Sequence, residues 1–213
     1  MKQFLFLVGL LLVLLLGLLW YNSQQAPRVI HMTVFVDTAP IMEQPPQTNG
    51  SESVLSPPQI DVVRINAILA AYHSPAAGKG QALYDLGRTY GISSDDALAF
   101  FFHESRFGTT GEARKTLALG NERCIQDRPC VDQNQGGYAQ MSSWEDGFAH
   151  WYQLIAYGYV QGQITIPLVG HPCTTIEQII PVYAPSADHN DVQGYINAIT
   201  GALHAWRSGQ VMI

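Results

Sequence analysis

The sequence predicts a mostly α-helical domain with a small irregular lobe, preceded by an apolar N-terminal segment and a polar linker. Three observations lead to this prediction. An unbroken apolar run extends from Phe4 to Trp20, a stretch rich in Pro, Ser, Thr and Gln follows Asp37, and several segments after Gln59 place apolar residues at helical spacing. A chain of 213 residues suits one folded domain with additional segments.

Residues 1–21 are predicted to form an uncleaved signal anchor, a single transmembrane helix. Lys2 is the only charged side chain of this segment, and the run from Phe4 to Trp20 would span roughly 25 Å as a helix, slightly less than a bilayer core. Trp20 and Tyr21 suit the membrane interface, and Lys2 favours a cytoplasmic N-terminus. The rest of the chain is therefore expected outside the cytoplasm. A cleaved signal peptide is the alternative, and it also exports the domain.

Residues 22–58 are predicted to be an extracytoplasmic linker. The segment "RVIHMTVFVD", Arg28–Asp37, is β-branched and partly alternating, so it is expected to form a short strand. The polar stretch after it contains almost no core residues, which is typical of a flexible tether that holds a domain away from a membrane. The folded domain is expected to cover residues 59–213.

Helical spacing or cap residues predict six helices in this domain. They cover residues 60–73, 78–92, 93–105, 142–162, 174–185 and 190–209. Gly91 is placed as a C-terminal stop, and Ser143 as an N-cap. Thr174 stands three residues before Glu177, the spacing of a capping box. The segment "SADHND", residues 186–191, is interpreted as a turn and N-cap for the last helix rather than as a calcium site.

The segment from Gly108 to Met141 is polar and Gly-rich and has no sustained period, so we expect loops and a small hairpin there. In an exported domain, Cys124 and Cys130 are the preferred disulfide pair, because they enclose a short polar loop. Three reduced thiols are the alternative. No zinc site is expected, because no close Cys or His pairs have the spacing of metal ligands.

The net charge of −6 excludes the basic surface that nucleic-acid binding requires. The low content of charged residues and the many Gly and Tyr residues suit a neutral, hydroxyl-rich ligand better. No metal or organic cofactor is implied.

Glu104 is the candidate catalytic residue, because it ends the apolar run "ALAFFFHES". A carboxyl group that is partly desolvated in a cleft has a raised pKa, as a general acid acting on a glycosidic bond needs. Glu122 is the best-placed second carboxylate among the acids of the lobe, which also include Glu112, Asp127 and Asp132. The alternatives are a helix-end glutamate paired with Arg106 or Arg114, and an exposed loop glutamate at position 122.

Three motifs, "HESRFG", "LGNERC" and "YAQMSSWEDGFAHWYQLI", together resemble the glucosaminidase domain of bacterial autolysins and flagellar hydrolases, in the lysozyme-like superfamily. The similarity runs over most of residues 59–207. It implies a lysozyme-like fold and hydrolysis of β-1,4 bonds in peptidoglycan or a related GlcNAc-containing glycan, most of all the N-acetylglucosaminidase cleavage. The absence of a Gly-Leu-Met-Gln motif favours this branch over lytic transglycosylases.

The resemblance also implies roles for individual residues. Glu104 matches the proton donor, and Tyr183 in "VYAPS" matches an aromatic residue that contacts the sugar. Met141 stands where the family often has a tyrosine, so Tyr138 is a substitute candidate three residues earlier. Asn121 is a candidate for binding an acetamido group or holding a turn. Ser105 is a further substrate-binding candidate, although hydrogen bonding at the helix end is its favoured role.

Two other functions stay open at this point. The first is a muramidase or lytic transglycosylase that uses the same acid. The second is a membrane-tethered glycan-binding module without catalytic activity, which the methionine at position 141 keeps open.

Overall fold

The computed structural model describes residues 51–213. The predicted anchor, the predicted strand Arg28–Asp37 and most of the predicted linker lie outside the described residues. Within residues 51–213, no helix is both long enough and apolar enough to cross a membrane. This part of the chain is mostly helical with a two-stranded sheet, which confirms the predicted mostly α class.

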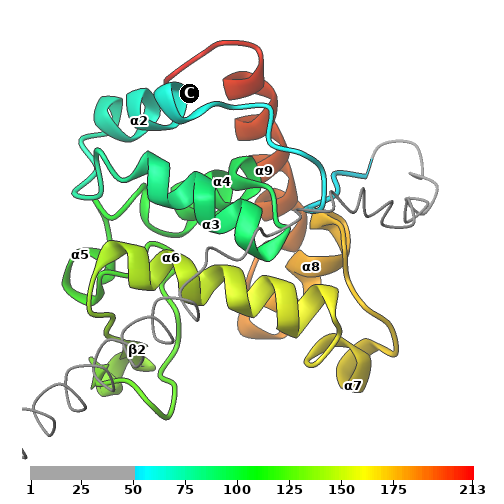
Figure 1. Cartoon of the computed structure of the whole chain (residues 1–213). Coiled ribbons are helices and arrows are strands. Elements are labelled where there is room, and N and C mark those ends of the chain that lie inside the picture. Colours follow the sequence, from blue (N-terminus) through cyan, green and yellow to red (C-terminus); the bar gives the residue numbers. More distant parts are fainter. Residues whose placement is uncertain (1–50) are drawn as a thin grey trace, which may run out of the picture. The chain divides into compact units, whose positions relative to one another are not determined.

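Figure 1 shows how the elements are arranged. The α-helices are α2 (Val62–Ala71), α3 (Gly80–Tyr90), α4 (Ser94–Ser105), α5 (Ala113–Thr116), α6 (Trp144–Gln153), α7 (Thr165–Val169), α8 (Ile176–Tyr183) and α9 (Val192–Arg207). The two antiparallel strands β1 (Cys130–Val131) and β2 (Tyr138–Ala139) are joined through the 3-10 turn η1 (Gln133–Gln135). A π-helix, η2 (Leu154–Val160), continues α6, and a second 3-10 turn, η3 (Ser186–Asp188), follows α8.

The central helix of the domain is α4. Every residue from Ser94 to Phe101 is buried, and α4 contacts both α3 and α9. A helix that is buried on all faces needs apolar side chains on all faces, and the run "ALAFFF" supplies them. Near its start, the buried Asp95 carboxylate accepts hydrogen bonds from the Ile60 N–H at 3.2 Å and from the Arg207 Nε at 3.1 Å. These bonds compensate the cost of burying its charge.

Three predicted helix ends are confirmed. Gly91 ends α3 in the left-handed conformation, with φ of 67°. The Ser143 hydroxyl accepts a hydrogen bond from the Asp146 N–H at the start of α6. The Asp191 side chain accepts one from the Gly194 N–H at the start of α9.

The capping box predicted at Thr174 and Glu177 is wrong. Helix α8 begins one residue later, after Thr175, and neither side chain closes the box. The Glu177 carboxylate instead accepts a hydrogen bond from the Glu52 N–H at 3.4 Å. The local pattern predicts that the Glu177 carboxylate caps its own helix. It instead bonds to a segment that is far away in the sequence.

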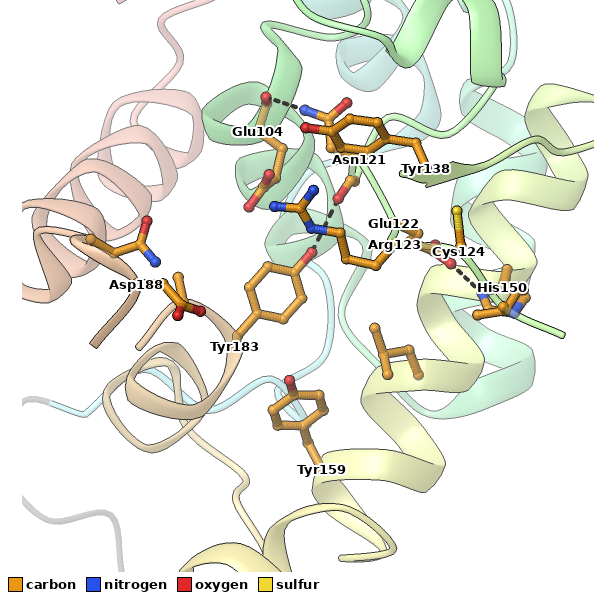
Figure 2. Close-up of a pocket in the computed structure, with 15 residues that line it drawn as sticks. Glu104, Asn121, Glu122, Arg123, Cys124, Tyr138, His150, Tyr159, Tyr183 and Asp188 are labelled. Carbon is orange, nitrogen blue, oxygen red and sulfur yellow. Dashed lines mark hydrogen bonds and ion pairs between the residues drawn. The ribbon is translucent and has the colours of Figure 1, made fainter. Parts of the chain in front are cut away.

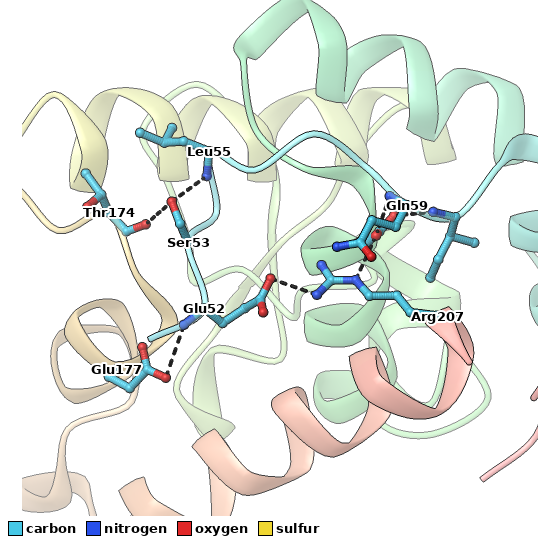
Figure 3. Close-up of polar contacts among 9 residues, drawn as sticks. Glu52, Ser53, Leu55, Gln59, Thr174, Glu177 and Arg207 are labelled. Carbon is cyan, nitrogen blue, oxygen red and sulfur yellow. Dashed lines mark hydrogen bonds and ion pairs between the residues drawn. The ribbon is translucent and has the colours of Figure 1, made fainter. Parts of the chain in front are cut away.

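That segment is the strap, residues 52–55, which composition assigns to the linker (Figure 3). Ser53 forms a β-bridge with Thr175, and the Val54 N–H donates to the Thr174 carbonyl at 3.0 Å. The Val54 side chain is fully buried in the core. The packed part of the chain thus begins upstream of Gln59, because one buried side chain and a short backbone pairing are enough to hold the strap.

The irregular lobe between α4 and α6 contains α5 and the two strands. A disulfide joins Cys124 and Cys130, whose Cα atoms are 5.3 Å apart, and Cys173 is a free, buried thiol. Two nitrogens of the Arg128 guanidinium donate to the Asp146 carboxylate at 2.7 Å each, which attaches the lobe to the start of α6. The lobe therefore has a fixed position beside the C-terminal end of α4.

Candidate active site

Glu104 occupies the last turn of α4, and the chain reverses directly after it. Arg106 and Phe107 both adopt the left-handed conformation, with φ of 45° and 58°. The Ser105 hydroxyl stabilises this turn, since it donates to the Leu119 carbonyl at 2.8 Å and accepts from the Gly108 N–H at 2.9 Å. The structure does not support the substrate contact predicted for Ser105, because this side chain is fully buried and its hydroxyl is used within the protein.

The Glu104 carboxyl group is half-buried and accepts a hydrogen bond from the Tyr195 hydroxyl of α9. Burial raises the pKa of Glu104, while the hydrogen bond from Tyr195 and the positive charge of Arg123 act in the opposite direction without cancelling it. The pKa of Tyr195 is itself raised well above its usual value by burial and by the Glu104 charge, so its phenol stays a donor. Glu104 therefore holds its proton to a higher pH than an exposed glutamate.

The Glu104 side chain lines a cavity of about 550 Å³ (Figure 2). This volume lies in the range of small-molecule sites. The walls come from the end of α4, the loop 120–125, β2, the α6–η2 helix, the end of α8 and the turn after it. The lining residues are Glu104, Gly120, Asn121, Glu122, Arg123, Cys124, Ile125, Tyr138, His150, Leu154, Tyr159, Tyr183, Ala184, Asp188 and Asn190.

Asn121 connects the loop 120–125 to the helix that carries Glu104. Its side-chain N–H donates to the Glu104 backbone carbonyl at 2.6 Å, and its backbone is left-handed, with φ of 48°. Asparagine tolerates this conformation better than most residues do. The Asn121 side-chain oxygen is buried, with no hydrogen-bond partner among the described residues. Asn121 thus holds the helix end and keeps one acceptor unused beside the cavity.

Glu122 faces the cavity from the same loop, and only 7% of the residue is exposed. Its carboxylate pairs with the His150 Nδ1 of α6. The hydrogen bond that the Glu122 carboxylate accepts from His150 is the main reason why the pKa of His150 is raised. Backbone pairing positions Glu122, since the Ala139 N–H of β2 donates to its carbonyl at 3.0 Å. The cavity therefore contains a second carboxyl group, which is paired with a histidine.

Three tyrosines add aromatic surface to the cavity. The Tyr183 hydroxyl donates to the Gly120 carbonyl at 3.3 Å, and the Arg123 guanidinium lies 4.9 Å from the centre of the Tyr138 ring. Burial raises the pKa of Tyr159 to about 12 and that of Tyr183 well above its usual value. These two phenols are therefore neutral at physiological pH, and the rings offer apolar faces and hydroxyl groups to a ligand.

The structure brings most of the predicted site residues together. Five of them line the same cavity, namely Glu104, Asn121, Glu122, Tyr138 and Tyr183. Met141 does not line it, since its side chain is buried in a small cluster inside the lobe. Glu112 and Asp132 both pair with Lys115 instead, which removes them as candidates for the second carboxylate.

The residues of this site that were not predicted from the sequence include Arg123, His150 and Tyr159 on the cavity wall, and Tyr195, which bonds to Glu104. His150 had a usable signal, because it is a histidine within the aromatic part of its helix and stands four residues before Leu154, which also lines the cavity. No sequence signal pointed to Tyr195, because 91 positions separate it from Glu104. Its position in the apolar pattern of the last helix is that of an ordinary core residue.

Among residues 51–213, no group of three or more His, Cys, Asp or Glu side chains is arranged to hold a metal ion. A scan of the sequence against protein-family models finds no match, and a search of curated proteins finds no significant similarity.

Proposed function

We propose that this chain is a peptidoglycan hydrolase with a lysozyme-like domain, which cleaves β-1,4 bonds as an endo-β-N-acetylglucosaminidase. The observation that carries the proposal is the half-buried Glu104, whose pKa is raised by burial and whose side chain faces a cavity lined by tyrosines and polar groups. These are the properties of a general acid in glycoside hydrolysis. The same proposal places the domain outside the cytoplasm on an N-terminal membrane anchor, or secreted if the signal is cleaved.

In the proposed reaction, the protonated Glu104 gives its proton to the glycosidic oxygen as the bond to C1 breaks. The carboxylate that forms accepts the hydrogen bond of Tyr195, which stabilises the charged product of the proton transfer. Positive charge develops on the sugar ring at the same time. The Glu122 carboxylate on the cavity wall favours this charge, and His150 keeps Glu122 in place.

Two routes complete the reaction. The 2-acetamido oxygen of the substrate can attack C1, a known exception to the two-carboxylate rule. Alternatively, Glu122 can activate a water molecule on the opposite face of the sugar. The anomer of the first product separates these routes in an NMR measurement, because substrate assistance retains the β configuration and direct attack by water inverts it.

The test is a digest of purified peptidoglycan by the full-length chain, read by mass spectrometry of the released fragments. We expect fragments with N-acetylglucosamine at the reducing end, and Glu104→Gln should lower the rate by about 10²–10⁴-fold, the usual contribution of a general acid. Glu145→Gln is the matched control, since this glutamate is partly exposed and pairs with Lys79 at 2.6 Å. Circular dichroism verifies that both variants are folded.

Other products would contradict the proposal in distinguishable ways. Reducing-end N-acetylmuramic acid would identify a muramidase, and an anhydro product, one water lighter, would identify a lytic transglycosylase. A folded chain that binds peptidoglycan without cleaving it would be a glycan-binding module.

A further inference from the structure

Helix α7 exposes three large apolar side chains on the surface of the domain. The exposed fractions are 49% for Ile166, 67% for Leu168 and 44% for Val169. We call these three side chains the apolar tip. Exposed apolar residues are common singly, but a cluster on one short element indicates a contact surface.

The apolar tip has a well-defined position. Thr165, the first residue of α7, is fully buried, and its hydroxyl donates to the Tyr159 carbonyl at 3.1 Å. The Cys173 N–H donates to the same carbonyl at 3.0 Å, so both ends of the α7 segment are attached to η2. The three apolar side chains are therefore presented to solvent by a fixed backbone.

The sequence around the apolar tip contains no acidic side chain and no basic side chain other than histidine. Between Asp146 and Glu177 there is no Asp, Glu, Lys or Arg, although the whole chain has a net charge of −6. Burying a charged side chain in an apolar environment costs free energy. The segment between Asp146 and Glu177 can therefore approach a lipid surface without burying an Asp, Glu, Lys or Arg side chain of its own.

The strap pairs with a segment that is close to the apolar tip in the sequence. It pairs with residues 174–176, which begin five residues after Val169. Upstream of the described residues, 29 residues separate Tyr21, the end of the predicted anchor, from Ser51. The flexible tether that composition predicts for these residues would have a root-mean-square span of about 30 Å. An anchor at residues 1–21 would thus keep the apolar tip at a high local concentration near the bilayer.

From these observations we propose that the apolar tip inserts into the interfacial region of a lipid bilayer, as a second membrane contact besides the predicted anchor. Ile166 and Leu168 would enter the boundary between headgroups and acyl chains, where apolar side chains without charged neighbours are stable. Tyr159 lines the cavity and also holds α7, so this contact would set the height of the cavity above the membrane. The proposal depends on the predicted anchor and is independent of the proposed hydrolase activity.

The test places an environment-sensitive fluorophore, NBD, at Leu168→Cys in the full-length chain, reconstituted in phosphatidylcholine liposomes. Val63→Cys is the matched control, since Val63 is 78% exposed and lies on α2, far from α7 (Figure 1). The native thiol Cys173 is buried, and the other two cysteines form a disulfide, so only the introduced thiol is labelled. We expect NBD at position 168 to emit at shorter wavelength and to be quenched by lipids with nitroxide-labelled acyl chains, and NBD at position 63 to show neither effect.

Four outcomes would overturn the proposal. Water-like emission at both positions would show that the tip does not enter the bilayer. A blue shift at position 168 without quenching by nitroxide lipids would identify a protein contact, such as a second copy of the chain. Equal quenching at both positions would mean that the domain has no preferred face toward the lipid. A chain that does not float with the liposomes would overturn the proposal together with the predicted anchor.

Discussion

Glu104 and Tyr195 form the residue pair that decides the chemistry of the cavity. Burial raises the pKa of Glu104, and the phenol of Tyr195 stabilises its ionised form. The two effects have opposite signs, so a change at Tyr195 alters the protonation of Glu104 without removing the carboxyl group. His103 stacks on the Tyr195 ring, with ring centres 3.7 Å apart, and so holds the phenol in place.

Replacement of this tyrosine, Tyr195→Phe, should shift the pH profile of activity. The hydrogen bond favours the ionised carboxyl, so its loss raises the pKa of Glu104 further and moves the alkaline limb of the profile to higher pH. We also expect a loss of stability of about 1–2 kcal/mol. Rate measurements against pH check the first effect, and urea unfolding checks the second.

Tyr72→Phe is the control for this experiment, because the Tyr72 hydroxyl accepts from the Ile213 N–H at 2.7 Å and does not line the cavity. It should lower stability without moving the pH profile. An unchanged alkaline limb in Tyr195→Phe would contradict the assignment of Glu104 as the titrating acid.

At the scale of elements, the contact between α6 and the lobe depends on a glycine. A Cβ atom at Gly147 would lie 2.3 Å from the Leu117 carbonyl oxygen, which is a backbone atom that cannot move aside without shifting the lobe. Glycine normally weakens a helix, so its presence in α6 reflects this close approach.

Two glycine substitutions should therefore have opposite effects. Gly147→Ala is expected to destabilise the domain by ~3 kcal/mol through overpacking. Gly201→Ala should stabilise it by about 1 kcal/mol, since a methyl group added to this exposed glycine of α9 would have no neighbouring atom within 4 Å and alanine is the better helix former. Urea unfolding of both variants measures the difference, and a stabilising Gly147→Ala would show that the lobe is not packed against α6.

The helices were largely predictable from the sequence because their caps and apolar spacing are local. The switch from α6 to the π-helix η2 after Gln153 was not, since the aromatic pattern "WYQLIAYGY" suits either helix type and tertiary packing decides between them. Helices α5 and α7 have only four and five residues and carry too little periodic signal. Local patterns predict an element well where its hydrogen bonds join residues that are close in the sequence. They fail where a distant segment supplies the partner, as the strap does for Glu177.

At the scale of the whole molecule, three buried or paired groups make stability depend on pH. Burial raises the pKa of Asp96 well above its usual value and raises that of Glu104, and the bond with Glu122 raises that of His150. Each group binds protons more tightly in the folded than in the unfolded chain. Their contributions to stability are therefore complete at a pH below the pKa of each group in the unfolded chain. These contributions are lost as the pH rises through the pKa of each group in the folded chain.

We accordingly expect a higher urea midpoint at pH 5 than at pH 8. The pKa of His103, which burial lowers, acts in the opposite direction near neutral pH, and the lowered pKa values of Glu145 and Asp146 do so only at more acidic pH, where these carboxylates become protonated. Asp96→Asn should reduce the difference between pH 5 and pH 8. A urea midpoint that rises from pH 5 to pH 8 in the wild-type chain would contradict this expectation. It would show that losing the protons of these groups does not destabilise the folded chain.

The strap extends the domain beyond the boundary that composition predicts. Val54→Ala should lower the free energy of unfolding by about 2 kcal/mol, because it removes two buried methyl groups and leaves a cavity. Its neighbour provides the control, since Leu55 is 38% exposed and Leu55→Ala should change stability by less than ~0.5 kcal/mol. Equal effects of the two substitutions in urea unfolding would argue against a strap that is part of the core.

The site was only partly predictable, and the reason is topological. Glu104, Asn121 and Glu122 are close in the sequence, and the loop after α4 brings them together by itself. His150 and Tyr159 reach the cavity, and Tyr195 reaches Glu104, only because α6, η2 and α9 pack around the loop. One sequence without its relatives contains no information on such long-range pairs. The two carboxyl groups were therefore predicted from the sequence. The side chains that shift their pKa values or hold them in position were not.

The strap also determines how the domain would respond to mechanical tension. A pull applied at residue 51 reaches the rest of the folded domain at Glu52, whose carboxylate pairs with Arg207 at 2.8 Å (Figure 3). The bonds from the strap to residues 174–176 would open one after another, before Val54 leaves the core. Because α8 and its Tyr183 follow directly after these residues, such a pull would loosen the tyrosine side of the cavity first. In single-molecule pulling from residue 51, this release should appear as a low-force step ahead of global unfolding.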